Sequence, residues 1–355
     1  MSGSRGTTIY DLARETGFSA STVSRALSGS GQIRPDTVRR IREVAGAMGY
    51  RPNHVARSLT VRRSDSIGLM LPDIANPFFP ALVREIQLLA HQHGRTLLLC
   101  NTGGVPEVEI EYLEILASRR IDGVLTMGLS ASTDVVRQYL QGGMRFVALD
   151  RASTAPEILS VLADHRQGGL LATLHLTSMG HRRIGYVSGP LNLAVAQERL
   201  EGHRDALRLS GLSPDARWEA AGDFSEASGY EEAEKLLARA PELTALAVAN
   251  DLMALGVIAA LRERGREVPA DVSVVGFDDI ELGRYAVPTL TTVRQPLAAL
   301  ARAAIELLLG SPTADGAVTQ PGLMPVEMVV RDSTGPPPHA NRRVVTTPVR
   351  QGSRR

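Results

Sequence analysis

The chain has little cysteine and no long apolar run. Cys100 is the single cysteine, which excludes an internal disulfide framework and is typical of a reducing compartment. None of the apolar stretches approaches the roughly 20 uninterrupted residues that a membrane-spanning helix needs. The amino terminus, MSGSRGTTIYDLARE, has no apolar run after its early arginine, so it does not resemble a secretory signal. We therefore expect a cytoplasmic protein with no membrane partner.

Motifs of the common enzyme classes are missing as well. The segment GYVSG (185–189) places its serine one position later than the G-x-S-x-G of a nucleophile elbow. Neither G-x-G-x-x-G nor G-x-x-x-x-G-K-[ST] occurs, so no loop that cradles nucleotide phosphates is indicated. His91 and His93 stand two apart on an expected helix, where they cannot share a metal from one face. The adjacent Asp278 and Asp279 point apart and form no acid–base pair. From these absences together, we expect neither enzymatic activity nor a cofactor or metal.

Charge is distributed unevenly along the chain. Residues 1–63 carry 11 arginines against 4 acidic residues, and residues 335–355 carry 5 arginines and no acid. The body between them, 64–334, has 23 basic against 34 acidic residues, although the whole chain has a net charge of +1. A basic head on an acidic body favours a head that binds a polyanion, whereas an ordinary solvated basic face is the alternative.

From Ser66 onward, short apolar runs alternate with longer amphipathic segments. The runs that predict strands are 66–72, 95–101, 122–127, 146–150, 183–189, 246–250 and 272–278. Segments with helical periodicity between them include 81–94, 108–120, 198–211 and 251–265. Continuous apolar strands separated by helices predict parallel sheets covered on both faces, and the length favours two α/β subdomains.

Four regions follow from these patterns. Residues 7–50 have the apolar period and caps of a compact helical domain, and 51–65 form a connector rich in charge. We expect an α/β domain of two subdomains over 66–335. The tail 336–355 combines proline, arginine and polar residues, which predicts disorder.

The stretch TIYDLARETGFSASTVSRALSG predicts two short helices joined by a tight corner. Thr8 is a suitable N-cap, and Gly17 stands where a helix ends by turning left-handed. Ser19 can cap the second helix, and a third segment, 35–50, supplies further apolar residues to a small three-helix core. This is the pattern of a helix-turn-helix, although an ordinary helical corner has similar spacing.

The exposed face of the second helix favours DNA binding. Ala20, Ser21, Ser24 and Arg25 are small or polar, and no acid lies among them. Small residues at the amino-terminal end let a helix enter the major groove, where its positive dipole end favours phosphate. Arg25 can make a bidentate contact with a guanine edge.

The same stretch, followed by GYRPNHVARSLTVRRSDSIGLMLPDIANPFF, resembles the amino-terminal part of LacI/GalR-family transcriptional regulators. Further family motifs follow in order: DGVL (122–125), GHRRIGYVSGP (180–190), RLEGHRDAL (199–207), ANDLMALGV (249–257), VPADVSVVGFDDI (268–280), PTLTTVRQP (288–296) and VVRDST (329–334). The resemblance covers residues 7–335. It implies a sequence-specific DNA-binding regulator, a repressor, that binds a pseudo-palindromic operator of double-stranded DNA as a homodimer.

The resemblance also implies a hinge helix in the connector, formed on DNA in the minor groove. Leu59 matches the residue that wedges between central base pairs and kinks the duplex. The DNA-contacting residues expected from the motif and the resemblance together are Thr8, Tyr10, Ser19, Ala20, Ser21, Thr22, Ser24, Arg25, Asn53, His54, Ala56 and Leu59. Because the tail has no leucine heptad, we expect a dimer rather than a tetramer.

The body is similar to the family's effector domain, which itself resembles periplasmic sugar-binding proteins with two lobes around a cleft. Cleft residues belong at the carboxyl ends of strands, and the effector-binding residues expected by position are Phe78, Phe79, Asp150, Arg199, Phe224, Asn250 and Asp278. Phe79 could instead be plain core, and Asp278 could cap the next turn. His165 departs from the asparagine usual in the family, with an effect on hydrogen bonding or pH sensitivity left open.

The effector itself is not identified by the residues. A set of carboxylate, arginine and amide groups suits a polyhydroxylated sugar, which we favour, while two aromatic residues also suit a purine nucleobase. Whether the effector releases or promotes DNA binding is equally open. A transport protein with the same body is an alternative class, against which the basic head and the amino terminus argue.

Overall fold

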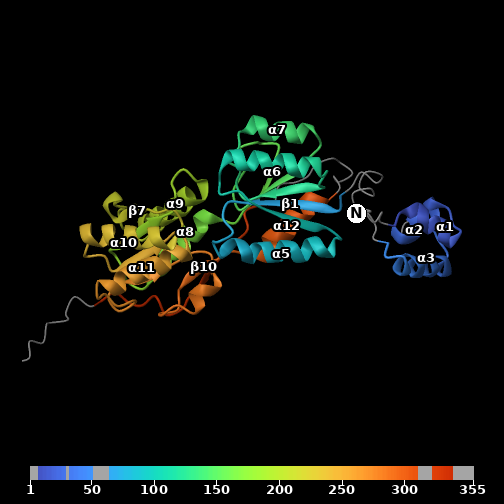
Figure 1. Ribbon diagram of the computed structural model, residues 1–355. Helices are drawn as coiled ribbons and strands as arrows, with labels where there is room; N and C mark the ends of the chain where they lie inside the picture. Colours follow the sequence, from blue (N-terminus) through green and yellow to red (C-terminus); the bar gives the residue numbers. More distant parts are fainter. Residues whose placement is uncertain (1–6, 29–31, 51–63, 311–321, 339–355) are drawn as a thin grey trace, which may run out of the picture. The chain divides into compact units, whose positions relative to one another are not determined.

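The structure, a computed structural model, describes residues 7–28, 32–50, 64–310 and 322–338, and the chain divides into two compact units, Met1–Asp65 and Ser66–Arg355. The predicted hinge residues Asn53, His54, Ala56 and Leu59 lie outside the described residues, as does most of the predicted tail. Figure 1 shows the elements of both units.

The first unit is a three-helix bundle. Its helices are α1 (Ile9–Thr16), α2 (Ala20–Ser28) and α3 (Pro35–Ala47), and each contacts the other two. The side chains that fill its core are Leu12, Val23, Ala26, Ile41 and Ala45. All five come from the apolar periodicity seen in the sequence, so the predicted three-helix core is confirmed.

The two residues predicted to begin and end α1, Thr8 and Gly17, are its N-cap and C-cap. Thr8 is the N-cap, and its hydroxyl accepts from the amide of Asp11 while the Asp11 carboxylate accepts from the amide of Thr8. Gly17 ends the helix with a φ of 77°, a left-handed conformation that costs a glycine little. Only three residues, 17–19, separate α1 from α2.

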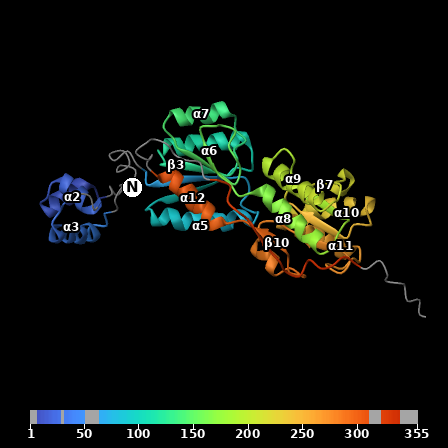
Figure 2. The same ribbon diagram turned by 180° about the vertical axis from the view of Figure 1, so that it is seen from behind.

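The second unit contains two α/β lobes, each built on a parallel sheet. Lobe 1 has the strand order β2-β1-β3-β4-β5, and lobe 2 has the order β7-β6-β8-β9. The strands of lobe 1 are β1 (Ser66–Leu71), β2 (Thr96–Asn101), β3 (Gly123–Thr126), β4 (Phe146–Leu149) and β5 (Leu159–Val161). Those of lobe 2 are β6 (Ile184–Ser188), β7 (Glu219–Ala221), β8 (Ala245–Val248) and β9 (Ser273–Val275). Figure 2 shows the same arrangement from behind.

Helices cover both faces of each sheet. In lobe 1 these are α5 (Phe78–Gln92) and α12 (Leu297–Leu309) on one face and α6 (Pro106–Ser118) and α7 (Thr133–Gln141) on the other. In lobe 2, α8 (His165–Ser178) pairs with α9 (Ala194–Leu209), and α10 (Glu226–Arg239) pairs with α11 (Asp251–Glu263). Right-handed crossovers place these two pairs on opposite faces, because β7 lies on one side of β6 and β8 on the other.

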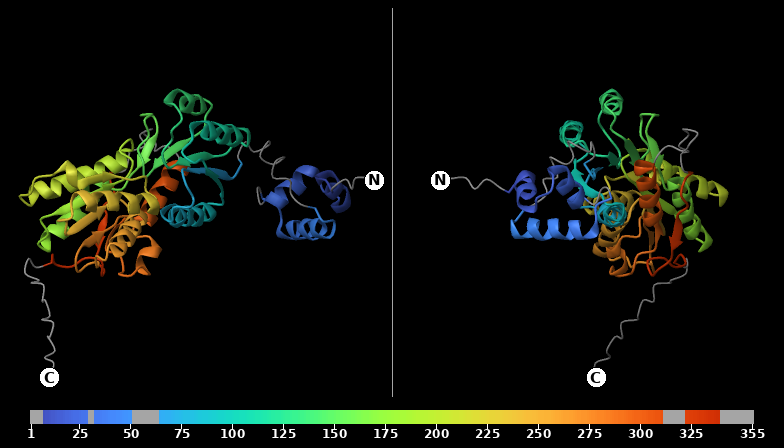
Figure 3. Two further views of the ribbon diagram at one scale, coloured as in Figure 1. Left: turned by 60° about the vertical axis from the view of Figure 1, so that its left-hand side comes forward. Right: turned by 90° about the vertical axis from the view of Figure 1, so that its right-hand side faces the viewer.

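The chain passes between the lobes more than once. It leaves lobe 1 after β5 to enter α8, and it returns to lobe 1 between β10 (Thr292–Arg294) and α12. A later pass leads to β11 (Glu327–Val329), which pairs antiparallel with β10. Met324 donates to Leu162 O and accepts from the amide of Asp164, both at 2.8 Å, so two of the passing segments lie side by side. Figure 3 shows these lobes in two further views.

The seven strands predicted from apolar runs are all present. Helices α5 and α9 begin earlier than the periodicity indicated, at Phe78 and Ala194. The first turn of α5 contains a proline, and that of α9, Ala-Val-Ala-Gln, is too uniformly apolar to show a helical period. The three-residue strands β5, β7, β10 and β11 were not predicted, since segments this short show no period of their own. No helix within the described residues is long and apolar enough to cross a membrane.

Candidate functional site

The amino-terminal end of α2 presents small polar groups to the surface of the first unit. Ser19 caps the helix, since its hydroxyl accepts from the amide of Thr22 at 3.2 Å. The same hydroxyl lies 2.9 Å from the hydroxyls of Ser21 and Thr22. Ser21, Ser24 and Arg25 are exposed, so the predicted reading face is accessible.

Other predicted DNA contacts surround this face. The Tyr10 ring on α1 is 75% exposed, which is a large apolar surface to leave in water. Thr8 is also exposed, but its hydroxyl is engaged with Asp11 as part of the capping box. Arg25 Nε donates to Ser21 O at 3.2 Å, which directs the guanidinium toward the amino-terminal end of α2. Contact of these residues with DNA stays a prediction.

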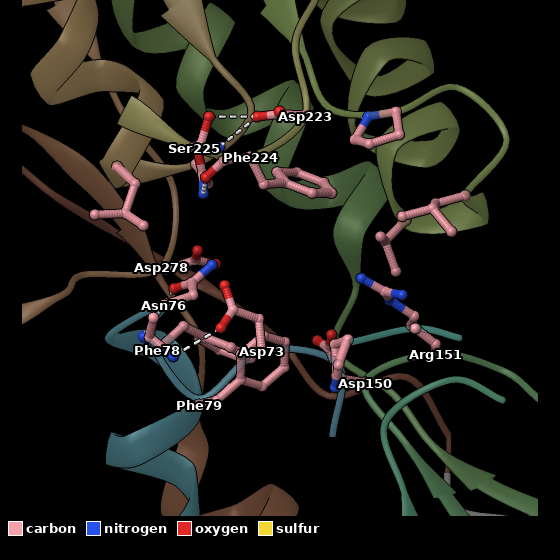
Figure 4. A pocket seen from close by; sticks show the side chains of 18 of the residues that line it. Asp73, Asn76, Phe78, Phe79, Asp150, Arg151, Asp223, Phe224, Ser225 and Asp278 are labelled. Carbon is pink, nitrogen blue, oxygen red and sulfur yellow. Dashed lines mark hydrogen bonds between the residues drawn. The ribbon is translucent and has the colours of Figure 1, made fainter. Parts of the chain in front are cut away.

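A cavity of about 490 Å³ lies between the two lobes of the second unit. All seven residues expected at an effector site line it: Phe78, Phe79, Asp150, Arg199, Phe224, Asn250 and Asp278. Lobe 1 supplies the first three at the carboxyl ends of β1 and β4, and lobe 2 supplies the other four. Figure 4 shows that aromatic rings approach the cavity from both lobes.

The aromatic groups are held firmly by their surroundings. Phe78 and Phe79 open α5 and meet edge to face, with ring centroids 5.3 Å apart. They are only 5% and 6% exposed, so both are core side chains that also border the cavity. The Phe224 ring lies against the backbone of Gly189, where a Cβ would come within 2.2 Å of it. A side chain at position 189 would therefore displace this ring.

Three of the cavity residues have left-handed backbones. The φ angles are 66° for Asp150, 75° for Phe224 and 114° for Asp278. For residues with a Cβ this conformation costs of order 1–3 kcal/mol, and it persists where surrounding structure imposes it. Such outliers gather at binding sites, and here each follows a strand that ends at the cavity.

Arg199 and Asp278 form a buried pair at the inner end of the cavity. Arg199 Nη2 lies 3.5 Å from Asp278 Oδ1, and both side chains are almost fully buried. Gln295 Nε2 donates to the same carboxylate oxygen at 2.9 Å. Burial raises the pKa of Asp278 to about 7, although Arg199 and Gln295 act in the opposite direction. Asp278 therefore does not cap the next turn and is engaged at the cavity.

Asn250 and Asp150 have different supporting roles. Asn250 caps α11 by accepting from the amide of Met253 at 3.0 Å, and its Nδ2 donates to Phe224 O at 2.9 Å. It thus fixes the backbone of Phe224 rather than offering a free amide. Asp150 is 5% exposed, and its Oδ1 has no hydrogen-bond partner among the described residues, with His165 Nε2 the nearest nitrogen that is recorded, at 3.5 Å. A buried acceptor without a donor is costly, so this oxygen is suited to a donor from a ligand.

Several cavity residues were not among the predicted ones. Asp73 and Asp223 line the cavity, together with Asn192 from the loop after β6. Hydrogen bonds from Ser225 hold the pKa of Asp223 below its usual value, so this carboxylate is ionised. All three lie in short loops that follow strands, so a search of every strand end for polar residues would have found them.

No metal site accompanies this cavity. In the part of the chain that the structure describes, no group of three or more His, Cys, Asp or Glu side chains could hold a metal ion.

The five carboxylates in the cavity wall, namely Asp73, Asp150, Asp223, Glu226 and Asp278, outnumber the two guanidinium groups of Arg151 and Arg199. The cavity is therefore rich in hydrogen-bond acceptors.

Comparison with known proteins gives a family match in each of the two units. Residues 8–53 match the model of the bacterial regulatory proteins of the lacI family, and residues 173–334 match a periplasmic binding protein-like domain. The HTH-type transcriptional repressor PurR of Aliivibrio salmonicida is 34% identical over 303 residues, which is 85% of this chain and 91% of that protein.

Solved structures give the same result. The lac repressor dimer bound to operator and the anti-inducer ONPF superposes with a TM-score of 0.83 at 29% identity, covering 93% of this chain and 100% of that one. The complex of the transcriptional regulator CelR with cellobiose has a TM-score of 0.70 at 31% identity, covering 92% and 99%. The chain belongs to the lacI family of bacterial regulatory proteins, and it is a DNA-binding transcriptional repressor under the control of a small-molecule effector.

Proposed function

We propose that the chain is a homodimeric repressor whose operator binding is controlled by a sugar held between the two lobes. The observation that carries this proposal is the cavity wall, because aromatic rings and acceptor-rich carboxylates from both lobes surround one space. A ligand in this space contacts residues that belong to separate sheets. It can therefore shift the equilibrium between lobe arrangements, since the arrangements differ in how well they bind it.

The chemistry of the wall favours a polyhydroxylated ligand. Ionised carboxylates accept hydrogen bonds and cannot donate them, so Asp223 needs donors such as sugar hydroxyls, and the unpartnered Oδ1 of Asp150 is a further acceptor. An anionic ligand would meet repulsion from the more numerous carboxylates of the wall. Phe79 and Phe224 can lie against the apolar face of a sugar ring. CelR, a structural neighbour, binds the disaccharide cellobiose. A nucleobase is the second candidate, because it also stacks between aromatic rings and offers N–H donors.

For the DNA we propose that α2 enters the major groove with Ala20, Ser21 and Arg25 toward the bases. Ala20 and Ser21 are small enough to let the helix approach the base edges, and they set which bases are preferred. Arg25 supplies the strongest single readout, a bidentate pair with guanine that discriminates by about 1–3 kcal/mol. Tyr10, Ser19, Thr22 and Ser24 then contact phosphates and groove walls.

A homodimer is supported by apolar surface along one edge of lobe 1. Strand β2 is the edge strand of its sheet, and Leu99 on it is 45% exposed. Leu88 is 54% exposed and belongs to α5, which contacts this strand; Ile115 on α6 of the same lobe is 46% exposed. Natural proteins cover such apolar edges with a partner. Two copies joined here would present two α2 helices to a pseudo-palindromic site.

The proposal assigns no catalytic step to the chain. The buried acid Asp251 is fully engaged, since it accepts from Thr292 Oγ1 at 2.6 Å and from the amide of Ile280 at 2.8 Å. Asp278 is paired with Arg199 and Gln295. Neither carboxylate stands free beside a nucleophile in the described part of the chain, which supports binding rather than turnover.

The experiment that tests the proposal has two arms. In the first, fragments of the source genome are selected for binding at moderate salt and sequenced, and we expect enrichment of a pseudo-palindrome. Retention of no fragment, or of all fragments equally, would contradict specific operator binding. In the second, thermal unfolding is followed with D-ribose, cellobiose and hypoxanthine. A rise in Tm with a sugar supports the proposed effector class, and a rise with hypoxanthine alone assigns the site to nucleobases.

A further inference from the structure

His165 lies at the junction of the two lobes. It is the first residue of α8, four residues after the end of β5 in lobe 1, and its side chain is 2% exposed. Its Nε2 lies 3.1 Å from Asp150 O in lobe 1, and its Nδ1 contacts Arg199 in lobe 2. The imidazole therefore connects the main chain of one lobe with a cavity side chain of the other.

The partners of the ring fix its protonation. Arg199 donates to His165 Nδ1 from both Nε at 3.3 Å and Nη2 at 3.2 Å. Because a guanidinium cannot accept a hydrogen bond, Nδ1 must carry the lone pair, and Nε2 then carries the proton that it donates to Asp150 O. Burial first, and the charge of Arg199 second, lower the pKa of His165 to about 4. The ring is thus a neutral group with one acceptor and one donor in fixed places.

The distance between His165 and Arg199 is set by two glycines. A Cβ at Gly169 on α8 would come within 2.0 Å of Arg199 O, and one at Gly202 on α9 would come within 2.0 Å of Arg166 O. The two helices consequently cross with their backbones in contact. This crossing places the first turn of α8 beside the Arg199 side chain, whatever the side chains around it do.

Other contacts leave Arg199 little freedom. Nη1 donates to Ala249 O at 2.5 Å, and Cζ lies 3.7 Å above the centre of the Phe277 ring. Of the five N–H groups of a guanidinium, His165 engages two and Ala249 one. The two that remain, one on each Nη atom, are those that Arg199 can offer to Asp278 or to a ligand in the cavity.

We propose that His165 is a positioning residue for the effector site. Its Nδ1 accepts from the Arg199 guanidinium of lobe 2 and holds it in place, while its Nε2 donates to the main chain of Asp150 in lobe 1. It thereby sets the direction in which Arg199 offers its free N–H groups to a ligand. This inference rests on the proposed function, because the ligand is the effector proposed above. This role differs from simple packing, because an apolar side chain of similar size would fill the space but offer no acceptor to Arg199.

Three substitutions separate the two arms of the imidazole. In His165→Asn, the amide oxygen takes the place of Nδ1 and can accept from Arg199, but Asp150 O loses its donor. His165→Gln places an amide donor where Nε2 was and leaves Arg199 without its acceptor. His165→Leu removes both arms and keeps most of the volume. Urea unfolding of each variant establishes that it is folded at the temperature of the measurements.

The first measurement needs no ligand. In ¹H–¹⁵N spectra of arginine side chains, the Nε–H signal of Arg199 is assigned by its absence from Arg199→Lys. Its exchange with water reports the hydrogen bond to His165. We expect exchange in His165→Asn within a factor of about two of the unaltered protein, and about tenfold faster exchange in His165→Gln and His165→Leu, as the loss of one buried hydrogen bond implies. Equal exchange in all four proteins would overturn the positioning role.

The second measurement uses cellobiose as probe, or D-ribose if only that sugar raises the Tm of the unaltered protein. His165→Asn is expected to bind it within about threefold of the unaltered protein, and His165→Gln and His165→Leu about tenfold more weakly. Equal losses in all three variants would indicate a packing role and overturn the inference. If neither sugar raises the Tm of the unaltered protein, the proposed effector class fails, and the exchange rates alone decide the role of His165.

Discussion

The buried carboxyl of Asp278 predicts a pH dependence of stability that can be traced to the cavity. Its pKa in the folded protein is about 7, against 3.8 for an ordinary aspartate. Burial is the main cause, and the attraction of Arg199 only partly offsets it. Between these two pKa values the folded protein holds a proton at this site that the unfolded chain has released.

The sign of the effect follows from this difference. Because the folded state binds more protons, its stability falls as the pH rises through the folded pKa and levels off above it. For one group with pKa values of 3.8 and 7, the free energy of unfolding drops by about 2.6 kcal/mol between pH 5 and pH 8. Asp251 adds to this in the same direction, because burial first and the charge of Asp278 second raise its pKa.

The assay is urea unfolding at several values between pH 5 and pH 8, on the unaltered protein and on Asp278→Asn. In Asp278→Asn, we expect the decrease in the free energy of unfolding between pH 5 and pH 8 to be smaller by at least about 2 kcal/mol. Asp223→Asn is the matched control, because Asp223 lines the same cavity but has a pKa below its usual value and is ionised throughout this range. An unchanged pH slope in Asp278→Asn, or an equal change in Asp223→Asn, would refute the reasoning.

Four further substitutions test other parts of the structure. Phe224→Ala should weaken sugar binding about tenfold by calorimetry, since the ring loses its stacking surface, whereas Phe224→Tyr should retain it. Arg25→Ala should cost about 1–3 kcal/mol on the selected operator and little on random DNA in a gel-shift. Leu99→Glu places charge on the exposed edge strand and should convert a dimer to a monomer in sedimentation, while the same change at exposed Leu209 should not. Gly169→Ala should destabilise by at least about 2 kcal/mol in urea, because its Cβ would meet Arg199 O.

Much of the first unit could be predicted from the sequence because its determinants are local. Thr8, Gly17 and Ser19 are caps that act within one turn, and the apolar period of three helices fixes which residues meet. Phe79 and Asp278 could likewise be predicted at one cavity, although about 200 residues separate them, because parallel sheets gather the carboxyl ends of their strands.

Other features depend on contacts that no local pattern encodes. The three-residue strands β5 and β7 exist only because neighbouring strands pair with them. The tautomer of His165 depends on Arg199, 34 residues later, and on a crossing of α8 and α9 that two glycines permit. Asn250 was expected to support the ligand, whereas the structure shows its side chain bonded to the Phe224 backbone, a contact visible only once both strands have been placed.

The division of the cavity between two lobes constrains how an effector can act. Phe79 and Asp150 belong to lobe 1, whereas Phe224, Arg199 and Asp278 belong to lobe 2. A molecule that touches one set alone binds every lobe arrangement equally well and shifts no equilibrium, however tightly it binds. Control therefore requires a ligand that reaches both sets at once. Among ligands of one class, the effect on operator affinity should follow the contacts that span the lobes rather than the total binding energy.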